Sequence, residues 1–91
     1  MLFLPEKMKK YANVTGVYLI VCLSEKSRYV GSSSNIGFRL CRHYSDLNRN
    51  KHHNSNLQQN FNNYKAQNFR FRILEQVDSL SDYLLRKAEK K

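Results

Sequence analysis

Apolar residues fall along the chain in short blocks whose periods separate strands from helices. Thr15–Leu23 is nearly continuous in β-branched and aromatic residues, which is typical of a strand covered on both faces. After a polar turn, Arg28–Ser32 is predicted to return as the second strand of a hairpin. Asn68–Val77 alternates between apolar and mainly basic residues, so it is predicted as a third strand.

Between the second and third strands the apolar residues recur at helical spacing. A first helix is expected to begin near Asn35 or Ile36 and to run to about Asn48. A second helix follows a polar loop, with Asn54 or Ser55 as its cap. The residues expected to face the core from these helices are Leu40, Tyr44, Leu47, Leu57, Phe61 and Tyr64.

A last helix is predicted near the end of the sequence. Ser79 and Asp82 resemble a capping box, and leucines recur after it at helical spacing. The order β-β-α-α-β-α predicts an α+β fold, with a small three-stranded sheet flanked by three helices. The sheet is antiparallel in its hairpin and mixed or antiparallel as a whole.

Residues 1–14 have no strong period, so we divide the chain into an N-terminal extension, 1–14, and one domain, 15–91. Glu6–Tyr11 can form a helical turn. Lys7, Lys9 and Lys10 can contact phosphates, but a loose solvated segment is the favoured interpretation. The first residues are too short for a secretory signal.

The charge of the chain indicates an anionic partner. Lys and Arg number 16 against 7 Asp and Glu, a formal net charge of +9. These basic residues are spread along the chain, which favours a folded basic surface, and the commonest partner of such a surface is a nucleic acid. A basic protein kept soluble by its charge is the alternative. Membrane spanning is not expected, because no apolar run approaches the ~20 residues that it requires.

The cysteines indicate an intracellular protein with reduced thiols. Cys22 and Cys41 make a poor disulfide framework, and no Cys-x-x-Cys pair is present. His52 and His53 lack partners at the spacing of a zinc site. Abundant Asn and Lys suggest a genome rich in A and T, as in an organelle such as the mitochondrion, a phage-infected cell or an AT-rich microbe.

Five side chains have the chemistry to cleave a phosphodiester. Arg39 and His43 lie one helical turn apart and project from the same side of the first predicted helix. The hairpin brings Tyr18 and Tyr29 to the same region, and Glu89 can reach it from the last helix. A basic side chain beside a divalent cation neutralises the charge that develops on the phosphate. Each residue alone also suits packing or a solvated surface.

The order of these residues resembles the GIY-YIG endonuclease family. The two family triplets appear as Gly16-Val17-Tyr18 and Tyr29-Val30-Gly31, followed by Ser32. Further motif positions match Arg39, His43, His52–Asn54, Phe69–Glu75 and Glu89. The resemblance covers about Thr15–Lys91 and implies the fold of a GIY-YIG nuclease.

The resemblance implies a role for each matched residue. Tyr18 acts as general base or orients the attacking water, with His43 accepting its proton or holding its hydroxyl. Tyr29 hydrogen-bonds the scissile phosphate or the water, and Arg39 stabilises the transition state. Glu89 holds a single Mg²⁺ or Mn²⁺. Glu75 is a rival carboxylate that the family pattern makes structural.

The expected function is therefore a divalent-metal-dependent DNA endonuclease of the homing or mobile-element kind, or the catalytic domain of one. Double-stranded DNA is the expected partner, contacted by Ser32, Lys26, His52 and Asn54. A DNA-targeting domain outside this chain is expected to supply specificity. The alternative is a non-catalytic nucleic-acid-binding module that keeps the fold.

Overall fold

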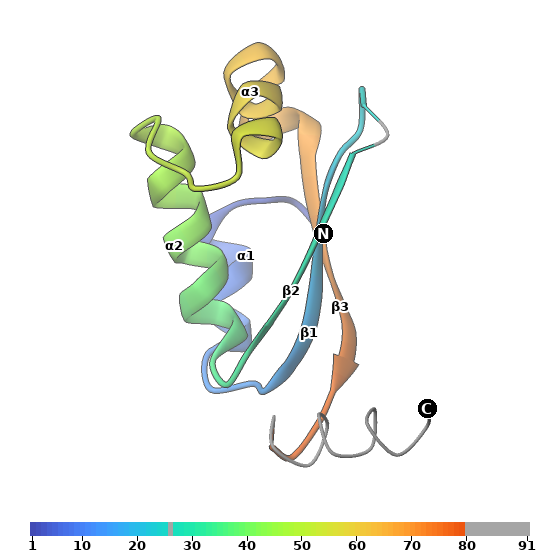
Figure 1. The fold of residues 1–91 in the computed structure, drawn as a ribbon. Coiled ribbons are helices and arrows are strands. Elements are labelled where there is room, and N and C mark those ends of the chain that lie inside the picture. Colours follow the sequence, from blue (N-terminus) through green and yellow to red (C-terminus); the bar gives the residue numbers. More distant parts are fainter. Residues whose placement is uncertain (26, 80–91) are drawn as a thin grey trace.

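Residues 1–25 and 27–79 of the computed structural model are described here, and they form an antiparallel sheet with helices on one face (Figure 1). The strands are β1 (Gly16–Cys22), β2 (Arg28–Ser33) and β3 (Phe69–Gln76). Their order is β2-β1-β3, and β1 pairs antiparallel with both neighbours. The predicted α+β fold is confirmed, and the sheet is antiparallel throughout.

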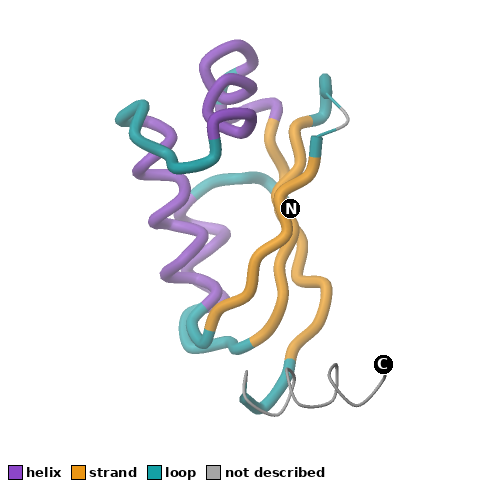
Figure 2. The backbone as a smooth tube through the Cα atoms, viewed as in Figure 1, coloured by secondary structure: helices purple, strands orange, loops and turns teal. Residues whose placement is uncertain are grey.

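The helices of the described residues lie within a few residues of where they were expected. They are α1 (Pro5–Met8), α2 (Ile36–Asn48) and α3 (Ser55–Tyr64), with short 3₁₀ turns at Lys9–Tyr11 and Ala66–Asn68. Figure 2 shows α1, α2 and α3 on the same side of the sheet. The helix predicted after Ser79 lies outside the described residues. Within residues 1–25 and 27–79, no helix has the length and apolar character needed to cross a membrane.

Two asparagines begin the longer helices. The Asn35 side chain accepts a hydrogen bond from the Phe38 amide at 3.1 Å, which starts α2. The Asn54 side chain accepts one from the Leu57 amide at 2.9 Å, which starts α3. Each cap satisfies an amide that has no partner within its helix, so both helices begin beside the predicted caps.

The core fills the space between the sheet and the helices. Side chains of alternate strand residues point toward α2 and α3, because successive residues of a strand face opposite sides. The core residues from strands and long helices are Tyr18, Ile20, Cys22, Ile36, Leu40, Leu47, Leu57, Phe61, Phe69 and Phe71. The helical stripes that the sequence predicted are therefore the ones that pack against the sheet.

The N-terminal segment is part of this core, so the expectation of a loose solvated segment is wrong. Phe3 is 1% exposed, and its ring packs at 5.6 Å from Tyr44 and 5.8 Å from Phe69, between ring centroids. Met8 is fully buried. The Phe71 amide donates to the Met1 carbonyl at 2.9 Å, so the first residues run along β3. The polar and apolar pattern of residues 1–14 does not predict this contact, because the partner strand β3 is distant in the sequence.

We expect Phe3→Ala to lower the free energy of unfolding by about 3–5 kcal/mol, because it removes a buried aromatic ring and leaves a cavity. The matched control is Phe38→Ala, whose ring is 62% exposed and whose loss should cost within about 0.5 kcal/mol. Urea unfolding of the two variants and the wild type measures both values. Equal losses for the two variants would contradict the assigned packing of residues 1–14.

Candidate active site

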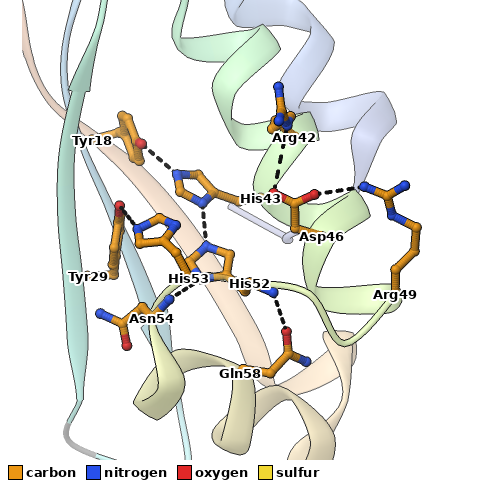
Figure 3. Close-up of polar contacts among 10 residues, drawn as sticks. All are labelled: Tyr18, Tyr29, Arg42, His43, Asp46, Arg49, His52, His53, Asn54 and Gln58. Atoms are coloured by element: carbon orange, nitrogen blue, oxygen red, sulfur yellow. Dashed lines mark hydrogen bonds and ion pairs between the residues drawn. The ribbon is translucent and has the colours of Figure 1, made fainter.

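Tyrosine and histidine side chains meet between the β1–β2 hairpin and the loop that joins α2 to α3 (Figure 3). Tyr18 comes from β1, Tyr29 from β2 and His43 from α2. His52 and His53 come from the loop. We call these five residues the Tyr-His cluster.

A continuous line of hydrogen bonds runs through the buried part of the Tyr-His cluster. The Tyr18 hydroxyl lies 2.7 Å from His43 Nε2, and His43 Nδ1 lies 2.6 Å from His52 Nε2. The Asn54 amide then donates to His52 Nδ1 at 3.0 Å. Tyr18 is fully buried, and His43 and His52 are 3% and 8% exposed. The line thus connects the sheet to α2 and to the start of α3 with little contact with solvent.

Gly31 makes room for the Tyr18 hydroxyl. The two residues are partners in the hairpin register. A Cβ atom on Gly31 would lie 2.5 Å from the Tyr18 oxygen, closer than real Cβ contacts come. The glycine of the second triplet is therefore required by the tyrosine of the first, which explains in physical terms why the two triplets occur together.

The exposed side of the Tyr-His cluster consists of Tyr29 and His53. The Tyr29 hydroxyl lies 3.2 Å from His53 Nε2, and the Tyr29 ring meets the His43 ring edge-on at 5.0 Å between centroids. His52 and His53 stack at 4.5 Å. Tyr29 and His53 therefore present polar atoms at the surface directly above the buried Tyr18–His43 pair.

Arg39 brings positive charge to the buried tyrosine. It is exposed on α2, one turn before His43, as the helical spacing predicted. Burial raises the pKa of Tyr18 above its ordinary value of 10.0, whereas hydrogen bonding and the charge of Arg39 lower it. The guanidinium thus favours the phenolate form of Tyr18, and burial disfavours it.

Burial also keeps the two inner histidines uncharged. Loss of solvent is the largest cause that lowers the pKa of His43 from 6.5 to about 3, and the nearby His52 and Arg39 lower it further. Burial is likewise the first cause that lowers the pKa of His52, followed by His53. Both imidazoles are consequently neutral at pH 7, and each carries one N–H and one lone pair.

Not every predicted site residue lies in the Tyr-His cluster. Ser32 is exposed on β2, and strand alternation places it on the face opposite Tyr29. The Asn54 side chain caps α3 while its amide contacts His52. The predicted contacts of Lys26 and Glu89 lie outside the described residues.

The described residues do not by themselves hold the expected metal ion. Across residues 1–25 and 27–79, no group of three or more His, Cys, Asp and Glu side chains is arranged to bind a metal. The histidines of the Tyr-His cluster are hydrogen-bonded or stacked on one another, and Mg²⁺ and Mn²⁺ prefer oxygen ligands. The Tyr-His cluster therefore contains no carboxylate ligand for such an ion.

Sequence reasoning missed the part that the loop plays in this site. It placed His52 among DNA contacts, whereas the side chain is buried against His43. It gave His53 no role, although His53 contacts Tyr29. The signal available was the adjacent histidine pair in an otherwise polar loop.

Known proteins share both the sequence pattern and the fold. A family model described as the GIY-YIG catalytic domain matches residues 14–91. The structure is similar to that of a mutant of the catalytic domain of the intron endonuclease I-TevI, with 31% sequence identity and a TM-score of 0.70. That alignment covers 82% of this chain and 76% of the other.

A second solved structure, the catalytic domain of the homing endonuclease I-TevI, has 28% identity and a TM-score of 0.70. Its alignment covers 84% of this chain and 82% of that chain. Among curated proteins, none matches the sequence.

We expect the protein to become less stable as the pH falls from 7 to 5. The unfolded chain binds a proton at His43 near the ordinary pKa of 6.5, but the folded chain does so only near 3. The stabilisation is thus complete above about pH 6.5 and is lost progressively toward pH 3. The loss by pH 5 should be about 1–2 kcal/mol, measured by urea unfolding at each pH.

The variant His43→Gln has no imidazole at this position, so its stability should change less between pH 7 and pH 5 than that of the wild type. The Asp46 carboxylate, whose pKa is lowered mainly by its hydrogen bond to Arg49, stays ionised in this window. An equal pH dependence in both proteins would show that His43 is not the group responsible.

Proposed function

The chain belongs to the GIY-YIG family, and on that premise we propose that it is a divalent-metal-dependent endonuclease that hydrolyses phosphodiester bonds in DNA. The observation that carries this proposal is the buried Tyr18–His43 pair, with Arg39 beside it and Tyr29 above it. This arrangement combines a candidate base, a positive charge and a surface hydroxyl within one small region.

Tyr18 is the proposed general base. Its oxygen lies against His43 and Arg39. Burial raises the pKa of the phenol, and the hydrogen bond and positive charge of Arg39 oppose that increase. As a phenolate it takes a proton from the attacking water. Gly31, which lacks a Cβ atom, leaves the space that this oxygen occupies beside β2.

Arg39 and Tyr29 are proposed to bind the reacting phosphate. The Arg39 side chain is exposed, so its guanidinium can hydrogen-bond phosphate oxygens and stabilise the negative charge that grows in the transition state. The Tyr29 hydroxyl, held by His53, orients the phosphate or the water. These residues bind at the surface, while Tyr18 stays buried behind them.

Glu89 is the proposed ligand for a single Mg²⁺ or Mn²⁺. When bound, such an ion would stabilise the leaving oxygen and polarise the phosphate. The absence of a metal-binding group elsewhere in residues 1–25 and 27–79 supports a carboxylate from another segment. Glu75 is the second carboxylate to test.

Double-stranded DNA is the proposed substrate, in a mobile-element role. The net charge of +9 and the exposed lysines of residues 1–14 suit a phosphate backbone. The similar solved structures are described as catalytic domains of an intron or homing endonuclease. By analogy, a targeting domain outside this chain would supply sequence specificity.

We expect Arg39→Ala to reduce nicking of supercoiled plasmid in Mg²⁺ by on the order of 10²-fold or more, because it removes charge stabilisation from the transition state. The matched control is Arg42→Ala, on the same helix, whose guanidinium pairs with Asp46 at 3.7 Å and is largely exposed. The control should retain activity within a few-fold. Equal nicking by both variants and the wild type would exclude the proposed role of Arg39.

Metal dependence has its own test. We expect Glu89→Gln to abolish Mn²⁺ binding in a calorimetric titration and to lose nicking activity, with Glu75→Gln as the comparison. Wild-type protein that binds DNA with a strong salt dependence but never cleaves it would instead indicate a non-catalytic nucleic-acid-binding module.

A further inference from the structure

The direction of the hydrogen bonds around Tyr18 follows from one group that can only donate. That group is the Asn54 backbone N–H, which lies 3.0 Å from His52 Nδ1. A backbone amide has no lone pair to offer, so His52 Nδ1 must be the acceptor. The single proton of neutral His52 is therefore on Nε2.

The proton on His52 Nε2 in turn determines where His43 carries its proton. His52 Nε2–H points at His43 Nδ1 over 2.6 Å, so His43 Nδ1 accepts and the proton of His43 is on Nε2. His43 Nε2–H then donates to the Tyr18 oxygen over 2.7 Å. Figure 3 draws the bonds of this line, and with these proton positions each of them donates toward Tyr18.

Charged forms of the histidines do not fit this line. Protonated His52 would place an N–H against the Asn54 N–H, and protonated His43 would place one against His52 Nε2–H. Both contacts would bring donors together without an acceptor. The burial of both rings also disfavours their charged forms.

We propose that His52 is a positioning residue whose tautomer, set by the Asn54 amide, makes His43 a donor to Tyr18, so that His43 cannot accept the Tyr18 proton. This inference rests on the proposed function for its place in catalysis. Arg39 is also only a donor, so both side chains that donate to the Tyr18 oxygen favour its phenolate, against burial and Tyr29, which raise its pKa. His43 is thereby assigned to holding the hydroxyl, one of the two roles that the family resemblance left open.

The proposed hydrolysis exchanges one bond at phosphorus and moves protons only through Tyr18 and water. Tyr18 first loses its hydroxyl proton to a water molecule, which must enter the site because the side chain is fully buried. The phenolate then takes a proton from the nucleophilic water as the oxygen of that water bonds to phosphorus and the bond from phosphorus to the leaving oxygen breaks. The leaving alkoxide takes a proton from solvent. His43 and His52 keep their protons throughout.

The direct test is the position of the proton on His43, measured by ¹⁵N NMR of the imidazole nitrogens near pH 7. We expect the wild type to carry it on Nε2. His52→Gln offers an amide N–H to His43 and should keep that tautomer. His52→Glu offers only a carboxylate, which accepts, so the proton of His43 should move to Nδ1.

The wild-type spectrum alone decides the tautomer, so the inference stays testable if His52→Glu does not fold. A wild-type His43 protonated on Nδ1, or a folded His52→Glu with the tautomer unchanged, would overturn it. Wild-type protein without nuclease activity but with the proton on Nε2 would refute the proposed function and leave the hydrogen-bond direction established.

The pKa of Tyr18 distinguishes a positioning role of His52 from a role in packing alone. Titration of Tyr18 by site-resolved ¹³C NMR, needed because the chain has six tyrosines, should give a higher pKa in His52→Glu than in the wild type, because a donor to the phenolate is lost. The pKa should be unchanged in His52→Gln. Among residues 1–25 and 27–79, the charged and titratable groups facing Tyr18 are Arg39 and His43 on α2 and Tyr29 on β2. The pH at which the nicking rate rises should be higher in His52→Glu than in the wild type and unchanged in His52→Gln. Identical pH–rate profiles in the two variants would contradict the proposal.

Discussion

The hydroxyl of Tyr18 is fully buried, and a buried hydroxyl without a partner costs about 1–3 kcal/mol. His43 satisfies it, but the imidazole then has a second nitrogen to satisfy, and His52 supplies that contact. The second nitrogen of His52 is satisfied in turn by the Asn54 amide, at the start of α3. In the described residues no buried side-chain polar atom lacks a partner. This line of hydrogen bonds therefore joins α2 and the start of α3 to the sheet, beside the apolar core that packs them together.

The same line divides the site into a neutral interior and a charged surface. The inner imidazoles are uncharged because burial lowers their pKa values. Positive charge stays on Arg39, which is exposed to an incoming phosphate. A site for a polyanion can thus concentrate charge where the substrate binds without burying a cation, which would be costly.

The local pattern of polar and apolar residues was sufficient to predict most of the fold. The strands, both long helices and the Asn35 cap lie within a residue or two of their predicted positions, because alternation and helical spacing reflect which face is buried. Residues 1–14 were misjudged because Phe3 is ordered by Tyr44 and Phe69, which are distant in sequence. A segment that gains its structure from remote partners leaves no period of its own to detect.

From the sequence alone, the hairpin, the two tyrosines and the helical pair Arg39 and His43 could be placed, since each depends on spacing within one element or one turn. The tertiary structure alone decided that His52 lies inside the cluster and that His53 reaches Tyr29. Those contacts depend on how the loop between α2 and α3 packs against the β1–β2 hairpin, which lies well before it in the sequence. Only three-dimensional packing could therefore show that a loop amide determines the proton positions around Tyr18.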